Sequence, residues 1–139
     1  MRISAAVTVA MMIASPAIAS GHSYFSDSAT YARAGATKSA GAYVPALAST
    51  NKGVVESALA HVAMIALTMP QCDLSSAKAS VKAIESRGAT AELRYKAWVV
   101  RMLMENPGLF AALPKAGYGE PDELFATLAG RLAEYHASR

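Results

Sequence analysis

Four side chains that can bind soft metals lie close together near the middle of the chain, at His61, Met64, Met69 and Cys72. Imidazole, thioether and thiolate groups are ligands for copper(I) and for haem iron. At about 100° per residue, His61, Met64 and Cys72 fall on one side of a helix, although Pro70 interrupts the helix before Cys72. We expect a structural histidine and methionines that fill a core. The alternative interpretation is a copper or haem site formed by His61, Met64, Met69 and Cys72.

Cys72 is the single cysteine of the chain and has no partner for an internal disulfide. Three interpretations of its thiol are open: an inert or buried group, an intermolecular disulfide that links a dimer, and a catalytic nucleophile. The neighbouring carboxylate of Asp73 disfavours the thiolate and therefore argues against the nucleophile. We expect an inert thiol, with a disulfide-linked dimer as the second interpretation.

The other reactive side chains match no catalytic pattern. No serine lies on a glycine-flanked elbow, and no two histidines have the spacing of a helical zinc site. The adjacent acids Asp122 and Glu123 follow Pro121, where they favour the positive end of a helix dipole. Arg94 and Arg101 flank Trp98 on an expected helix, which suits either an anionic partner or two solvated arginines. We therefore expect a non-enzymatic protein without catalytic residues or a bound cofactor.

The N-terminus is typical of a cleaved export signal. Residues 3–18 are apolar or small and follow a positive start at Arg2, and Ala17 and Ala19 occupy the positions that signal peptidase requires. The apolar run is shorter than the roughly 20 residues of a membrane span. Residues 1–19 are thus predicted to be a signal peptide, so the mature protein is periplasmic or secreted without stable membrane insertion.

Composition indicates one small folded domain and limits the partners. The chain has 139 residues, 53% of them hydrophobic, and a formal charge of +3. Such values exclude a highly charged disordered chain, a collagen and a disulfide-rich miniprotein. Lysine and arginine are scattered without a basic run, so we expect no nucleic-acid partner.

Residues 20–50 consist mostly of Ala, Ser, Gly and Thr, which predicts a flexible low-complexity leader. Its aromatic residues follow no sustained period: Tyr24, Phe25, Tyr31 and Tyr43. One alternative is a docking segment that becomes ordered on a partner. The other is an alanine-rich helix within residues 29–42.

Apolar residues recur at helical spacing throughout residues 51–139. They predict helices over about 53–69, 73–87 and 90–105, a single turn near 109–113, and a last helix that begins at Pro121. On the third helix, we assign Ala91, Tyr95, Trp98 and Met102 to the buried face, with Val99 and Leu103 beside them. The expected fold is all-α, a small four-helix bundle-like domain over 51–139.

These observations lead to two hypotheses. The first is an exported, non-enzymatic helical protein that binds another protein or a surface through its helices or its tyrosine-bearing leader. The second is soft-metal or haem handling by His61, Met64, Met69 and Cys72.

Overall fold

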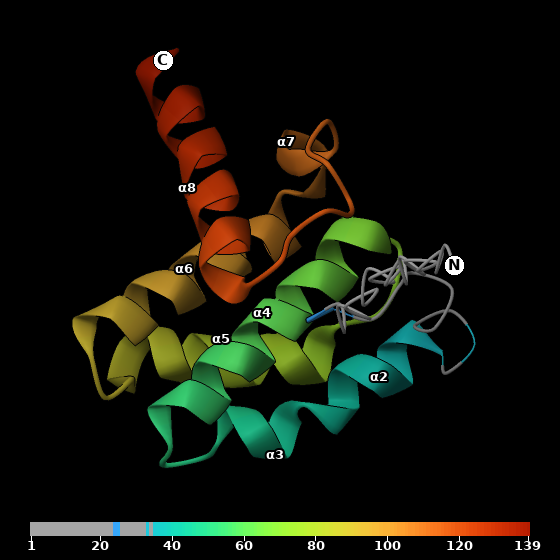
Figure 1. Ribbon diagram of the computed structural model, residues 1–139, viewed down its shortest axis with the longest axis vertical. Coiled ribbons are helices and arrows are strands. Elements are labelled where there is room, and N and C mark those ends of the chain that lie inside the picture. Colours follow the sequence, from blue (N-terminus) through green and yellow to red (C-terminus); the bar gives the residue numbers. More distant parts are fainter. Residues whose placement is uncertain (1–23, 26–32, 34) are drawn as a thin grey trace, which may run out of the picture.

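The described part of the chain is entirely helical. The computed structural model describes residues 24–25, 33 and 35–139, and within these ranges it has seven helices and no strand. In chain order they are α2 (Ala36–Ala42), α3 (Val44–Leu47), α4 (Lys52–Thr68), α5 (Ser75–Arg87), α6 (Ala91–Glu105), α7 (Pro107–Phe110) and α8 (Pro121–Ala137) (Figure 1). The all-α prediction is confirmed. The predicted signal peptide lies outside the described residues, so export stays a prediction.

Local signals in the sequence set the ends of the long helices. The Asn51 side chain accepts hydrogen bonds from the amides of Gly53 and Val54 and caps α4, while Thr90 Oγ1 accepts one from Leu93 and caps α6. Pro121 occupies the first turn of α8, where no backbone donor is needed. The predicted boundaries of these helices agree with the structure to within one or two residues.

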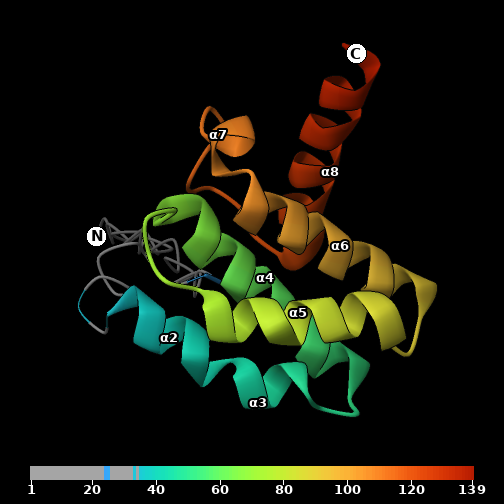
Figure 2. The same ribbon diagram turned by 180° about the vertical axis from the view of Figure 1, so that it is seen from behind.

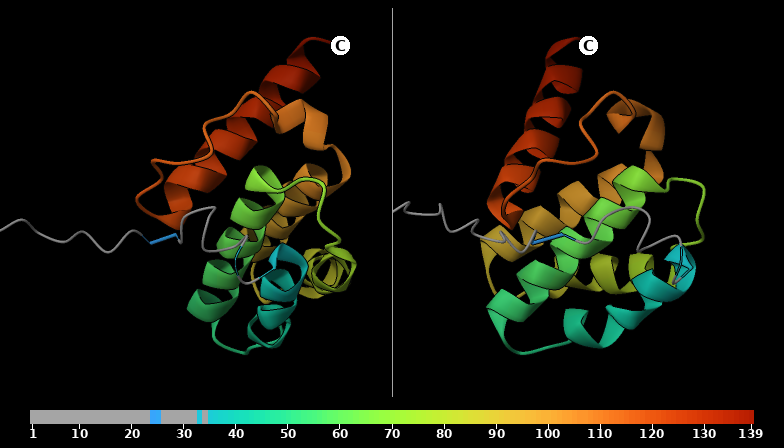
Figure 3. Two further views of the ribbon diagram at one scale, coloured as in Figure 1. Left: turned by 90° about the vertical axis from the view of Figure 1, so that its right-hand side faces the viewer. Right: turned by 45° about the vertical axis from the view of Figure 1, so that its right-hand side comes forward.

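The long helices pack around α4. Helices α5 and α6 form an antiparallel hairpin, and α6 makes extensive contacts with both α5 and α4. Helices α2 and α3 follow one another along α4 and α5 on the opposite side from α8 (Figure 2). The first part of α8 crosses α4 and α6, and its C-terminal part extends past them beside α7 (Figure 3).

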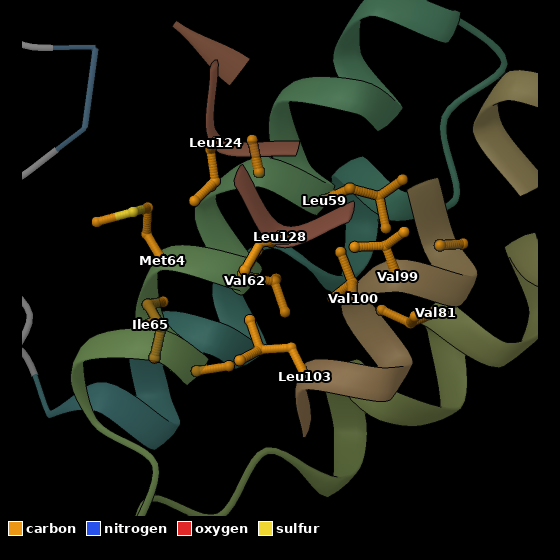
Figure 4. Packing of buried hydrophobic residues seen from close by; sticks show 14 of the residues in the cluster. Leu59, Val62, Met64, Ile65, Val81, Val99, Val100, Leu103, Leu124 and Leu128 are labelled. Carbon is orange, nitrogen blue, oxygen red and sulfur yellow. The ribbon is translucent and has the colours of Figure 1, made fainter. Parts of the chain in front are cut away.

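A continuous aliphatic core holds these helices together (Figure 4). Its largest fully buried side chains come from four different helices: Leu59, Ile65, Leu103, Phe110, Leu124, Leu128 and Leu132. Burial of each such side chain contributes roughly 1.5–3 kcal/mol. The core also explains why α4 is apolar almost all round, since neighbouring helices cover most of its surface.

Residues 36–47 differ from the flexible leader that the sequence predicts, because they form α2 and α3. Alanine-rich sequence favours a helix, and Ala40 and Leu47 are buried against the bundle at 0% and 4% exposure. Pro45 lies in the first turn of α3 and is compatible with it. The prediction is wrong for this part of residues 20–50.

Helix α6 is rotated relative to the orientation that the sequence predicts: Val99 and Leu103 are buried as expected, whereas Ala91 and Tyr95 are exposed. Its buried residues are Leu93, Lys96, Ala97, Val99, Val100 and Leu103. Tyr95 is 51% exposed, whereas Trp98 and Met102 are half-buried at the edges of the packed face. The helix has apolar residues on both sides, and the aliphatic side packs inward because its smaller side chains interdigitate with α4 and α5.

Candidate functional site

An apolar stripe that is exposed at Ala91 and Tyr95 and half-buried at Trp98 and Met102 runs along the outer face of α6. We call Ala91, Tyr95, Trp98 and Met102 the α6 stripe. Their spacing of four, three and four residues places them on one side of the helix, as in the contact seam of packed helices. The Tyr95 and Trp98 rings lie against each other, with centroids 5.7 Å apart. The stripe is therefore a small aromatic surface on a helix that the core holds rigidly.

Charged residues border the α6 stripe on the side of α5. Arg101 donates to Glu85 through Nε at 2.5 Å and Nη2 at 2.9 Å, and to Glu105 through Nη1 at 2.7 Å. The hydrogen bonds from Arg101 hold the pKa of the Glu85 carboxyl below its usual range. Arg94 donates to the Gly88 carbonyl at 2.7 Å. Both guanidinium groups thus have partners within the protein, and they join α6 to α5 and to the turn before α6.

Lys96 is a buried ammonium group on the core side of α6. Its Nζ lies 3.0 Å from Glu56 Oε1, 2.8 Å from Glu92 Oε1 and 3.0 Å from Asp122 Oδ1, so it links α4, α6 and α8. Burial alone lowers the pKa of Lys96, but the hydrogen bonds to the three carboxylates outweigh burial and raise it. Glu92 and Lys96 are four residues apart, so this ion pair lies within α6 itself. No local pattern in the sequence indicates that Lys96 is buried beside Glu56 and Asp122.

His61 lies within an aromatic cluster instead of an open site. The rings of Tyr24, Phe25 and Tyr43 have centroids 5.2–5.3 Å from the His61 ring, and Tyr43 stacks on it. His61 Nδ1 is 2.8 Å from the Ser57 carbonyl, which only accepts, so Nδ1 carries the proton. Three of the leader's aromatic residues therefore pack within the chain, and Tyr31 lies outside the described residues.

The four predicted metal ligands have different surroundings. Met64 and Met69 are 3% and 9% exposed within the core, and Met69 lies about 12 Å beyond His61 along the helix axis. Half-buried Cys72 lies in a pocket of about 240 Å³ that also includes Leu103 and Met104. This conformation does not gather all four side chains around one point. Metal or haem binding and the disulfide through Cys72 both stay predictions.

The described residues contain no metal-binding cluster and no membrane span. No group of three or more His, Cys, Asp or Glu side chains has a metal-binding arrangement there. No helix in those ranges has the length and apolar character needed to cross a bilayer.

Comparison with known proteins gives no relative. No family model matches the chain, and neither the curated proteins nor the solved structures contain a significant match.

Proposed function

We propose that this chain is an exported, non-enzymatic protein that acts by binding another protein through the α6 stripe. The observation that carries the proposal is the exposure of Tyr95 beside Trp98 on a helix whose other face is fixed in the core. Export rests on the N-terminal sequence alone.

The side chains of the α6 stripe suit a protein partner. Tyrosine, tryptophan and methionine are enriched where proteins meet, since they provide large contact areas at low entropic cost. The spacing of the stripe fits an amphipathic helix laid along α6. Charges of both signs border it, at Arg94, Arg101 and Glu105. Such a rim favours a protein over an anionic membrane, which attracts clusters of positive charge.

The direct test is site-specific photo-crosslinking in cells that export the protein. A photoreactive phenylalanine analogue replaces Tyr95, and the matched control carries it at Glu134, an exposed position on α8. We expect a discrete crosslinked species from position 95 that position 134 does not give. The adduct mass identifies either a different protein or a second copy of this chain.

A second variant separates binding from folding. Because Tyr95 is exposed, Tyr95→Ser leaves the helical fold intact by circular dichroism. We expect it to weaken binding to the captured partner by about tenfold, as substitution of an interface aromatic residue does. Equal crosslinking from both positions, or a partner that binds the Tyr95→Ser variant with unchanged affinity, would reject the proposal.

A further inference from the structure

A groove of about 440 Å³ lies between the α3–α4 connection, the end of α5 and the α5–α6 connection. Four buried aliphatic residues line it, each no more than 7% exposed: Leu47, Val55, Ile84 and Leu93. Its volume is within the roughly 300–1,000 Å³ of small-molecule sites. The groove contains no residue of the α6 stripe, so it is independent of the proposed protein-binding surface.

The charges around this groove are all positive. Lys52 and Arg87 are both exposed and are the charged residues among those that line it. Within the described part of the chain, neither side chain has a hydrogen-bond or ion-pair partner. The hydroxyl-bearing residues Thr50 and Ser80 also line the groove. An apolar floor is thus combined with two cations that have no counter-charge of their own.

We infer that this groove binds a small amphipathic anion, a molecule with a carboxylate head and an apolar chain. The aliphatic floor removes the chain from water, while the guanidinium of Arg87 offers a planar pair of donors that matches a carboxylate. A bare inorganic anion would leave the apolar floor unused. A cationic ligand would meet Lys52 and Arg87 without a compensating acid.

The test compares octanoate with the uncharged analogue octanol, both below their aggregation concentrations, on the mature chain. Amide chemical shifts from NMR locate binding, and calorimetry gives the affinities. We expect octanoate to shift residues in 47–55 and 80–93, and octanol to bind about tenfold more weakly. Binding of octanoate elsewhere, or not at all, overturns the inference.

Variants test the two parts of the groove separately. The double variant Lys52→Gln with Arg87→Gln should weaken octanoate binding by about tenfold and leave octanol binding unchanged. The matched control Lys38→Gln removes a positive charge from the exposed side of α2 and should leave both unchanged. If Lys38→Gln weakened octanoate binding as much as the double variant does, the net charge of the protein would attract octanoate, and this result would contradict a specific site in the groove.

A third variant tests the apolar part. Ala83 lines the groove from α5, and Ala83→Leu fills it with a larger side chain. With the fold verified by circular dichroism, this variant should lose binding of both octanoate and octanol. If it binds octanoate as tightly as the wild type does, the groove is not the binding site.

Discussion

The Lys96 ammonium is buried at 6% exposure, but its three partner carboxylates remain partly in water. The side chains of Glu56, Glu92 and Asp122 are 31%, 69% and 75% exposed. The solvent around Glu92 and Asp122 screens their attraction to Lys96, so Glu56 is the acid that depends most on it. Removal of one partner from a buried ion pair strongly destabilises a protein, because the remaining charge is left without compensation.

We therefore predict that Lys96→Ala lowers the free energy of unfolding by about 2–4 kcal/mol, because it removes the side-chain stem and leaves Glu56 without its cation. Lys96→Met keeps most of the stem and should lower it by about 1–2 kcal/mol. Urea unfolding followed by circular dichroism measures both. A Lys96→Met protein as stable as the wild type would show that the ion cluster contributes no net stability.

At the level of elements, the α5–α6 hairpin depends on an ion pair that acid disrupts. Arg101 lowers the pKa of the Glu85 carboxyl in the folded protein. The pair therefore stabilises the fold fully at pH values above the ordinary Glu pKa of about 4.3, and this stabilisation is lost as the pH falls through the lowered pKa of Glu85. We predict that Glu85→Gln lowers stability by about 1 kcal/mol at pH 7, and that its difference from the wild type shrinks toward pH 3. Chemical unfolding at several pH values measures this difference. The control Glu134→Gln removes an exposed acid on α8 and should behave as the wild type, and a constant deficit for Glu85→Gln at all pH values would contradict the prediction.

The turn between α5 and α6 has little space at Gly88. A Cβ atom there would lie 2.7 Å from the Ile84 carbonyl oxygen and 3.2 Å from Arg94 Cγ. Since the carbonyl belongs to the backbone of α5, the end of this helix must shift to accept a side chain. We predict that Gly88→Ala lowers the thermal unfolding midpoint and costs about 1–3 kcal/mol. The control Gly130→Ala lies in α8 with open space around it and should be neutral or stabilising.

The sequence predicts those features of the helices that depend on nearby residues, and it fails for those that depend on distant ones. The starts of α6 after Thr90 and of α8 at Pro121 follow from capping and proline chemistry within a few residues, so these two predictions are confirmed. The cap of α4 at Asn51 is an equally local signal, although it is not among the predicted helix starts. Which face of α6 packs against the core is determined by tertiary contacts and not by local sequence. Both of its faces carry apolar residues, and only the shape of the neighbouring helices determines that Leu93 and Val100 are buried while Tyr95 is exposed.

At the scale of the whole molecule, the N-terminal boundary of the folded unit is the feature that the sequence predicts least well. Residues 36–47 contain few large apolar side chains, and their helices are too short to be stable alone. They are held by contacts with α4, which follows directly, and with α5, which lies farther along the chain. The composition of residues 36–47 is therefore typical of a flexible leader, although Leu47 is part of the core.

This difference leads to a prediction about truncation. A chain of residues 51–139 begins at the boundary that the sequence suggests, but it lacks Ala40 and Leu47 and exposes the side of α4 and α5 that they cover. We expect it to be less stable than the full chain by at least about 3 kcal/mol, since buried aliphatic surface is lost on both sides of the contact. A chain of residues 35–139 retains α2 and α3 and is the matched control. Thermal and urea unfolding of the three proteins measures the effect. If the 51–139 chain unfolds at the same urea concentration as the 35–139 chain, α2 and α3 do not belong to the cooperative unit and the folded domain begins at α4.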